Sequence, residues 1–317
     1  MNEEDLWEKI ITELEEGKNI VLVIIIHRTG SAPNVPGAKM LVMSDNVMGT
    51  VGGGISEHRL QDCARVILSK GNLTVETLHL DHNENATENR SGMICSGLQK
   101  FALILFSKEH LPMVKEIKES HTRAVAGVFT INEESIYFES GISLKVDRIY
   151  SEEGTSWTYK ENTGVQDRFF IIGGGHVSLA LSRILKTLNF HVTIIDDRNK
   201  LPTMISNTYA NEKIVASYDS ITEIIPEGKN IFVAIMTFGH ISDQQVLEKI
   251  ITKKCKYMGM MASSRKKQQI FNNLEKKGIS KILLDKIHTP IGIKIKSHTP
   301  EEIAISIAAE IIQVKNS

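Results

Sequence analysis

Apolar runs and their periodicity divide the chain into two halves with different patterns. In the second half, a short apolar run at 169–172 is followed by a segment of helical period at 177–188 and a second apolar run at 192–195. Further apolar runs at 231–236 and 257–261 alternate with segments of helical period. This alternation of strands and helices predicts a Rossmann-like domain with a parallel sheet.

The first half lacks this regular alternation. A helix is expected from Asn2 to Gly17, and the uniformly apolar segment 20–26 predicts a strand that is buried on both faces. A hairpin over 39–51, a helix over 56–70 and a strand over 98–106 follow. These elements predict a mixed α+β domain.

The length of 317 residues favours two domains. We predict an N-terminal α+β domain over 1–150 and a Rossmann-like α/β domain over 168–317. The segment 151–167 between them is polar and contains glycine, which is typical of a linker.

Composition excludes several classes of protein. The net charge of −1 argues against nucleic acid or an anionic membrane as the partner. The longest apolar run, Ile20 to Ile26, is too short to cross a bilayer, and the acidic N-terminus does not resemble a signal peptide. Three cysteines without a CxxC pair are typical of a reducing compartment, so we expect a cytoplasmic protein.

The glycine-rich turn after the run at 169–172 predicts a dinucleotide site. Gly173 permits the tight turn into the helix, and Gly175 lets the backbone approach a pyrophosphate. Asp196 ends the next strand, where a carboxylate binds ribose hydroxyls and favours NAD(H) over NADP(H), a preference that Arg198 would weaken. Ser178 replaces the third glycine of the fingerprint, which predicts a wider gap between strand and helix.

Two other groups fall where parallel strands end, which is where such sheets bind ligands. Thr237, His240 and Asp243 follow one strand, and the last two are either an oriented acid–base pair or an unrelated histidine beside a dipole-stabilised aspartate. Ser264 and Arg265 follow another strand, as either an anion site or a helix cap with a solvated face.

A second glycine-rich loop lies in the first half, where Gly52, Gly53 and Gly54 lead directly into a helix. Such a loop lets a ligand contact backbone N–H groups. Glu57, in the first helical turn, is either part of this site or a residue stabilised by the helix dipole.

Among the three cysteines, Cys95 has the local sequence of a loop. Gly92 and Gly97 flank it, whereas Cys63 and Cys255 lie among apolar residues and read as core positions. Cys95 is therefore either a functional thiol, with neighbouring N–H groups that favour the thiolate, or a structural cysteine.

Several short motifs recur in a fixed order along the chain. In the first half they are Gly30 to Pro33, Pro36 to Met40, Gly49 to Glu57 and Met93 to Gly97. In the second half they are Ile172 to Val177, which includes His176, then Asp196 to Arg198, Met236-Thr237, Gly259 to Arg265 and Thr299 to Ala304. Together these motifs resemble the XdhC/CoxI family, the xanthine dehydrogenase accessory proteins.

The resemblance implies a maturation factor that binds molybdenum cofactor (molybdopterin), assists its sulfuration and delivers it to a molybdenum hydroxylase apo-enzyme. It also implies Cys95 as the cofactor-binding thiolate and metal ligand, although Ser96 replaces a family glycine beside it. Further expectations are a cysteine desulfurase as a partner, a homodimer, and NAD or another dinucleotide in the Rossmann-like domain. The alternatives are an NAD(P)-dependent oxidoreductase with His240 as proton donor, and a nucleotide-sensing binding module.

Overall fold

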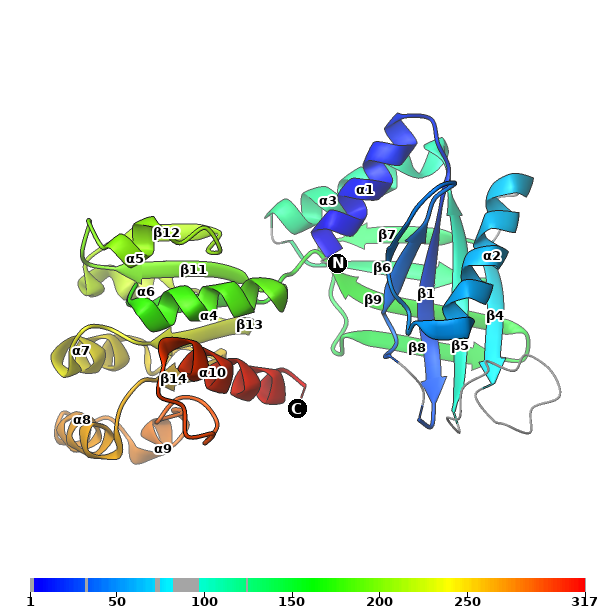
Figure 1. Ribbon diagram of the computed structural model, residues 1–317. Coiled ribbons are helices and arrows are strands. Elements are labelled where there is room, and N and C mark those ends of the chain that lie inside the picture. Colours follow the sequence, from blue (N-terminus) through cyan, green and yellow to red (C-terminus); the bar gives the residue numbers. More distant parts are fainter. Residues whose placement is uncertain (1–2, 32–33, 72–74, 82–96, 124, 317) are drawn as a thin grey trace. The chain divides into compact units, whose positions relative to one another are not determined.

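The computed structural model describes residues 3–31, 34–71, 75–81, 97–123 and 125–316. The chain forms two compact units, Met1–Val165 and Gln166–Ser317 (Figure 1). In the described part of the chain, no helix is long and apolar enough to cross a membrane. Cys95 lies outside the described residues.

The N-terminal unit contains two antiparallel sheets. The first has the order β3-β2-β1-β5-β4, and the second has the order β7-β6-β9-β8. The strands are β1 (Ile20–Thr29), β2 (Lys39–Val42), β3 (Val47–Gly49), β4 (Val75–Asp81), β5 (Leu98–Phe106), β6 (Gly127–Asn132), β7 (Ile136–Ser140), β8 (Arg148–Glu153) and β9 (Ser156–Thr163).

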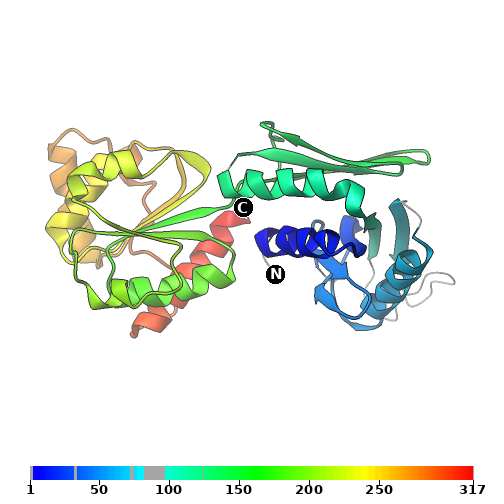
Figure 2. The same ribbon diagram turned by 90° about the horizontal axis from the view of Figure 1, so that it is seen from above.

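Helices cover both faces of the first sheet. Alternate residues of β1 and β5 point to opposite faces, so each face has its own core. On one face lies α2 (Gly54–Lys70); on the other, α1 (Glu3–Glu15), α3 (Leu111–Arg123) and the second sheet share a core around Trp7 and Phe129. Figure 2 shows α1 and α3 side by side.

The prediction of a linker over 151–167 is wrong for most of its length. Ser156–Thr163 form β9, which pairs with both β6 and β8. Trp157, Tyr159, Glu161 and Thr163 are buried on alternate positions of this strand. The polar members of this buried row hide the period of two, which is why the segment has the composition of a linker.

The C-terminal unit is built on a parallel sheet of order β12-β11-β10-β13-β14. Its strands are β10 (Arg168–Ile172), β11 (His191–Asp196), β12 (Glu212–Val215), β13 (Gly228–Ile235) and β14 (Cys255–Met260). Its helices are α4 (His176–Thr187), α5 (Pro202–Ile205), α6 (Ile221–Ile224), α7 (His240–Ile250), α8 (Ser264–Lys276), α9 (Lys281–Leu284) and α10 (Pro300–Lys315).

Helices cover both faces of this sheet, which makes three layers. Residues of α4 and α10 pack on one face, with the two helices side by side (Figure 1). Residues of α6, α7 and α8 pack on the other face. The prediction of a Rossmann-like parallel domain after a mixed α+β domain is confirmed.

Candidate functional site

The carboxyl edge of the parallel sheet contains a switch point, because β11 and β13 lie on opposite sides of β10. The loops after β10 and β13 touch there. Gly173 has φ 109°, and a Cβ atom on it would lie 2.2 Å from the carbonyl oxygen of Met236. A glycine is required at this position by both the backbone conformation and the space.

Two helices begin at this switch point without a side-chain cap. Gly175 precedes α4 and Gly239 precedes α7, and neither supplies a capping side chain. Side chains of Ser263 and Thr299 do cap α8 and α10. The first N–H groups of α4 and α7 therefore remain available at the edge where a phosphate would bind.

Asp196 does not face a ligand but is fully buried beneath the glycine turn. Its Oδ2 accepts hydrogen bonds from Gly174 N and Arg198 Nη2, both at 2.7 Å. Its Oδ1 accepts from Arg198 N at 3.0 Å and Nε at 2.8 Å. Burial acts to raise the pKa of Asp196, but the bonds from Arg198 and Gly174 outweigh it and hold the pKa below its ordinary value.

Ser178 occupies the place of the third fingerprint glycine and is buried. Its hydroxyl donates a hydrogen bond to the carbonyl oxygen of Gly173, so the serine bonds the turn it was expected to loosen. Ser182 Oγ donates to the Ser178 carbonyl at 2.7 Å, and Asn207 donates to Ser182 Oγ at 3.1 Å. A buried polar chain thus ties α4 to the loop that precedes β12.

Thr237 and Asp243 form one cluster after β13. Thr237 donates to Asp243 Oδ1 through its N–H at 2.9 Å and its hydroxyl at 2.6 Å. Lys266 pairs with the other carboxylate oxygen of Asp243. Because these groups occupy Asp243 and His240 is exposed, the proposed His240–Asp243 acid–base pair is not formed.

The remaining predicted residues of this unit are at the surface. His176 is exposed at the first position of α4, and Ser264 and Arg265 are exposed at the start of α8. Ser263, not Ser264, caps α8, by accepting a hydrogen bond from Lys266 N at 3.3 Å. The structure therefore brings Gly173, Gly175 and the loop of Thr237 together. Ser264 and Arg265 lie apart from them, at the start of α8.

The glycine loop of the N-terminal unit is closed by its own glutamate. Oε2 of Glu57 accepts hydrogen bonds from Thr50 Oγ1 at 2.5 Å and from Val51 N and Gly53 N at 3.0 Å each. Burial acts to raise the pKa of Glu57, but these bonds outweigh it and lower the pKa. Of the two alternatives for Glu57, the structure supports a structural role, since its carboxylate occupies the N–H groups a ligand would need.

In the N-terminal unit, Gly97 of one sequence motif lies against Ser31 of another, near the end of β1. A Cβ atom on Gly97 would lie 2.4 Å from the carbonyl oxygen of Ser31 and 2.7 Å from that of Thr29. The described start of β5 therefore packs tightly on the Gly30–Ser31 turn, and only glycine fits there.

Comparison with known proteins agrees with this geometry. The family model described as the XdhC Rossmann domain matches residues 169–311, which contain the whole switch point. The model described as the XdhC and CoxI family matches residues 13–80, which contain the Glu57 loop. The chain belongs to the XdhC and CoxI family.

Individual relatives match this chain over different fractions of its length. A Bacillus subtilis (strain 168) protein named as a probable xanthine dehydrogenase subunit is 22% identical, over 95% of each chain. The uncharacterized protein YqeB of Escherichia coli (strain K12) is 32% identical over 155 residues, which span 49% of this chain and only 28% of YqeB. A crystal structure described as a xanthine dehydrogenase from Bacillus halodurans shares the fold, with a TM-score of 0.79, 21% identity, and coverage of 100% of this chain and 96% of that one.

Sequence reasoning about the XdhC and CoxI motifs missed the role of Lys39. Its ammonium is buried between Glu3, at 2.7 Å from Oε1, and Glu161, at 2.9 Å from Oε1. Tyr159 donates to the other oxygen of Glu161 at 2.8 Å. A charged residue inside the apolar stretch 38–43 was the available signal for this ion cluster.

Lys100 is a second buried lysine that sequence reasoning missed. It pairs with Glu152 at 2.7 Å and lies over the rings of Tyr150 and Trp157, at 5.5 and 5.8 Å from their centroids. His27 stacks on Tyr150 with 4.6 Å between ring centroids. This cluster fastens the first sheet to the second at the end where Gly97 contacts the Ser31 turn.

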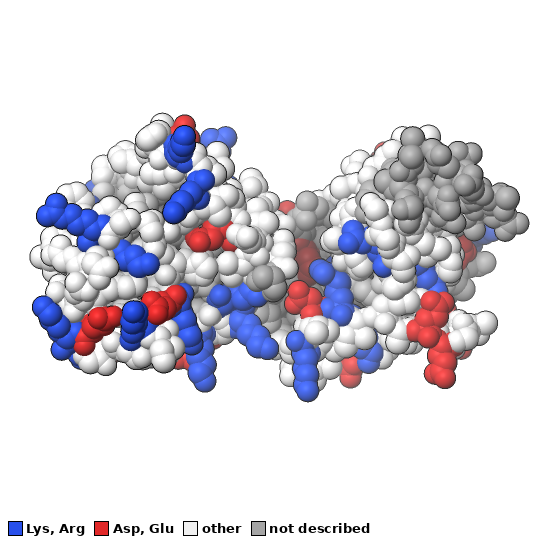
Figure 3. Space-filling view, turned by 90° about the horizontal axis from the view of Figure 1, so that it is seen from below, with Lys and Arg blue, Asp and Glu red and all other residues white. Residues whose placement is uncertain are grey.

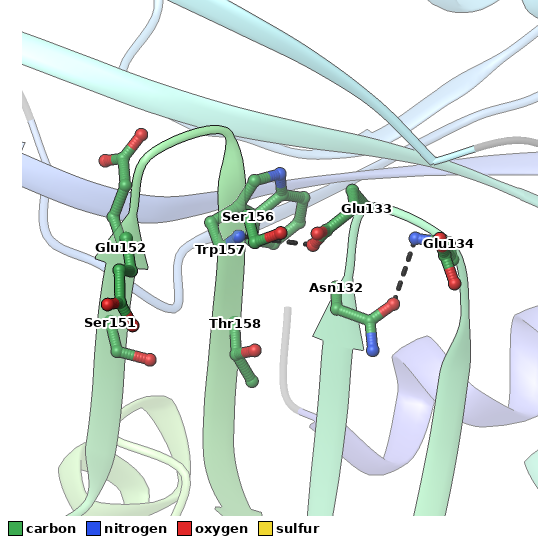
Figure 4. Close-up of a pocket in the computed structure, with 9 residues that line it drawn as sticks. Asn132, Glu133, Glu134, Ser151, Glu152, Ser156, Trp157 and Thr158 are labelled. Carbon is green, nitrogen blue, oxygen red and sulfur yellow. Dashed lines mark hydrogen bonds between the residues drawn. The ribbon is translucent and has the colours of Figure 1, made fainter.

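An open hollow of about 640 Å³ lies beside Trp157, between the turns that join β6 to β7 and β8 to β9. Figure 4 shows the residues that line it. Its polar groups are occupied locally. Glu133 accepts from Trp157 N at 3.2 Å, and Asn132 accepts from Glu134 N at 2.9 Å. These bonds stabilise two hairpin turns, and none of the predicted site residues lines the hollow.

The C-terminal unit has a net positive charge, because residues 166–317 contain 21 Lys and Arg against 14 Asp and Glu. On the face shown in Figure 3, acidic side chains lie next to basic ones over the described residues of this unit. The net charge of −1 belongs to the whole chain, so the acidic excess lies in the N-terminal unit.

Proposed function

We propose that this XdhC and CoxI family member is an accessory factor in the maturation of a molybdenum hydroxylase of the xanthine dehydrogenase type. The observation that carries the proposal is the match along nearly the whole chain. Both family segments occur in order, and the relative named as a probable xanthine dehydrogenase subunit is matched over 95% of each chain. In this role the protein binds molybdenum cofactor, assists its sulfuration and transfers it to the apo-enzyme.

The two glycine-rich loops differ in how well they fit the phosphate of the cofactor. Its phosphate requires free N–H donors, which the uncapped start of α4 after Gly175 supplies. The Gly52–Gly54 loop fits a phosphate poorly, because Gly53 N already donates to the Glu57 carboxylate and Gly52 N to Thr50 Oγ1, and the carboxylate would repel the phosphate. We therefore withdraw this loop as a phosphate site and assign Gly173, Gly175 and the α4 start to a phosphate or dinucleotide.

Molybdenum and its exchangeable sulfur require a soft ligand, which a cysteine thiolate provides. The described residues contain no group of three or more His, Cys, Asp or Glu side chains that could hold a metal ion. We therefore propose Cys95, in the motif that ends at Gly97, as the residue that binds the cofactor. The other two cysteines are half-buried, and burial, with a contribution from Glu227, raises the pKa of Cys255 to about 11.

Purification of the protein from cells that make molybdenum cofactor tests the proposal. Bound metal and pterin should co-purify, and co-expression should raise the activity of a molybdenum hydroxylase. Cys95→Ser should lose bound cofactor and client activation at an unchanged melting temperature, whereas the control Cys63→Ser should keep both. Full delivery by Cys95→Ser would remove Cys95 from the proposal, and absence of pterin from the parent protein would overturn it.

The proposal extends to partners. Delivery requires a complex with the apo-hydroxylase, sulfuration requires a sulfur donor such as a cysteine desulfurase, and we expect the factor to act as a homodimer. Size-exclusion chromatography with light scattering measures the last point directly.

An oxidoreductase is the competing hypothesis, with His240 as proton donor. The structure removes its main support, because Asp243 is held by Thr237 and Lys266 and does not orient His240. The purified chain should therefore reduce no NAD in the presence of purines, aldehydes or hydroxy acids. Multiple turnovers by the chain alone would favour the oxidoreductase.

A further inference from the structure

The dinucleotide site at the switch point has a feature that its fingerprint does not predict. All four lone-pair positions of the Asp196 carboxylate are occupied by Gly174 and Arg198. A ribose hydroxyl can donate to this carboxylate only by displacing one of them. Asp196 is also fully buried, so it is a scaffold for the turn and not the ribose ligand.

Arg198 is the group that the scaffold presents. Two of its five guanidinium N–H groups are held by Asp196, and three are left over for a ligand within the described chain. Its side chain is 39% exposed. A guanidinium fixed in this way is a pre-organised receptor for a phosphate.

Phe238 completes the arrangement from the other side of the switch point. It lies on the loop after β13, its ring centroid is 5.5 Å from the Arg198 guanidinium carbon, and it is 91% exposed. No core packing accounts for an aromatic ring this exposed. A flat exposed ring beside a guanidinium is suited to stack a nucleobase.

We propose that Arg198 and Phe238 bind the adenosine end of a dinucleotide and select one that carries a 2′-phosphate. The base stacks on Phe238, the 2′-phosphate takes the free N–H groups of Arg198, and the pyrophosphate lies at the start of α4. NADP(H) is therefore preferred over NAD(H), opposite to the expectation from the strand-end aspartate. This inference rests on the proposed dinucleotide site, whose α4 start is also the group proposed for the cofactor's phosphate, so a bound dinucleotide and that phosphate would exclude each other there.

One group opposes this selection. Asp197 is half-exposed, and its Oδ1 lies 4.0 Å from Arg198 Nε. Its charge repels a 2′-phosphate, so Asp197→Asn should tighten NADP(H) binding and leave NAD(H) binding nearly unchanged. This variant strengthens the predicted preference without touching the scaffold around Asp196.

Calorimetric titration of the full chain tests the inference, with NADP(H), NAD(H), adenosine 2′,5′-bisphosphate and AMP as probes. We expect the 2′-phosphorylated member of each pair to bind roughly tenfold more tightly, as one charge-assisted contact provides. Arg198→Lys keeps the positive charge but loses the paired N–H donors of the guanidinium. It should therefore reduce the ratio of the two affinities toward one. Phe238→Ala should weaken all four probes, and Phe238→Tyr should restore them.

The results that overturn the inference are distinct from those that test cofactor delivery. Tighter binding of NAD(H), binding of neither dinucleotide, or unchanged affinities in Phe238→Ala would each refute it. The melting temperature of Arg198→Lys shows whether the hydrogen bonds around Asp196 are intact. If they are not, Asp197→Asn still tests the inference, because it leaves these bonds in place and should tighten NADP(H) binding only. Client activation in co-expressing cells is measured separately, so a failure of dinucleotide binding can be distinguished from a failure of cofactor delivery.

Discussion

Two carboxylates determine how open the glycine-rich loops of the two units are. Glu57 places one oxygen among three donors, the Thr50 hydroxyl and the N–H groups of Val51 and Gly53. Asp196 accepts one hydrogen bond from its glycine turn, from Gly174 N, and accepts its other three from Arg198. The carboxylate of Glu57 therefore lies inside its glycine-rich loop, whereas that of Asp196 lies beneath its loop and bonds mainly to Arg198.

Removal of the Glu57 carboxylate should open its loop and destabilise the N-terminal unit. Glu57→Ala leaves Val51 and Gly53 N–H groups without their acceptor, at a cost of about 1–3 kcal/mol in the free energy of unfolding. Glu57→Gln keeps one acceptor oxygen and should lose less. Urea unfolding measures both, and Asp62→Ala, an exposed change on the same helix, is the matched control.

The lowered pKa of Glu57 gives this effect a pH dependence. A carboxyl whose pKa is lower in the folded state stabilises the fold above its unfolded pKa and loses that contribution as the pH falls through the folded value. The difference in stability between the parent and Glu57→Gln should therefore shrink below about pH 4. An equal difference at pH 7 and pH 3 would contradict the assigned hydrogen bonds.

At the scale of elements, the turn from β10 to α4 depends on a serine where a glycine was expected. Ser178→Ala should leave the Gly173 carbonyl without its buried donor and cost about 1–2 kcal/mol of stability. Ser178→Gly should cost more, because glycine also weakens a helix interior. Thermal unfolding of the C-terminal unit measures both, and a gain in stability in either variant would show that the serine strains the turn.

The pairing of β9 explains what the sequence could and could not predict. Uniformly apolar strands such as β1 and β10 were expected from their composition alone, because both faces are buried. The buried face of β9 contains Glu161 and Thr163, whose partners come from distant segments. A polar residue whose partner is far away in the sequence is indistinguishable from a solvated one, so the strand had the appearance of a linker.

The Lys39 ion cluster holds α1, β2 and β9 together, so its loss should destabilise the N-terminal unit. Lys39→Ala removes the nearer cation of the buried Glu161 and leaves only Arg148, at 3.9 Å, which costs about 3–5 kcal/mol. Lys39→Met with Glu161→Gln should recover part of this loss, because no buried charge remains unpaired. Lys18→Ala, in an exposed pair with Glu16, should have little effect in the same denaturation experiment.

The candidate site was predicted only in outline for the same reason. The positions of Gly173, Gly175 and Thr237 at strand ends follow from the βαβ pattern, and the structure brings their loops together. The partners of Asp196 and Asp243 do not follow from it. These partners depend on which side chains of neighbouring loops lie beside the two carboxylates in the folded chain. The local sequence around each aspartate does not contain this information.

For the whole molecule, each unit has its own apolar cores. Cores of the N-terminal unit extend from Leu6 to Tyr159, and those of the C-terminal unit extend from Phe169 to Ile311. We therefore expect residues 1–165 and 166–317 to fold when expressed separately. Circular dichroism should show a cooperative melt for each piece, and a piece that does not melt cooperatively would show that its stability depends on the other.

The uncapped starts of α4 and α7 have a consequence for the concentration dependence of binding. Their N–H groups attract small anions, so inorganic phosphate should compete with the pyrophosphate of the proposed dinucleotide. Nucleotide binding is then an exchange, and its apparent affinity falls as free phosphate rises. In a cell, the occupancy of the C-terminal unit would follow the ratio of nucleotide to phosphate and not the level of nucleotide alone.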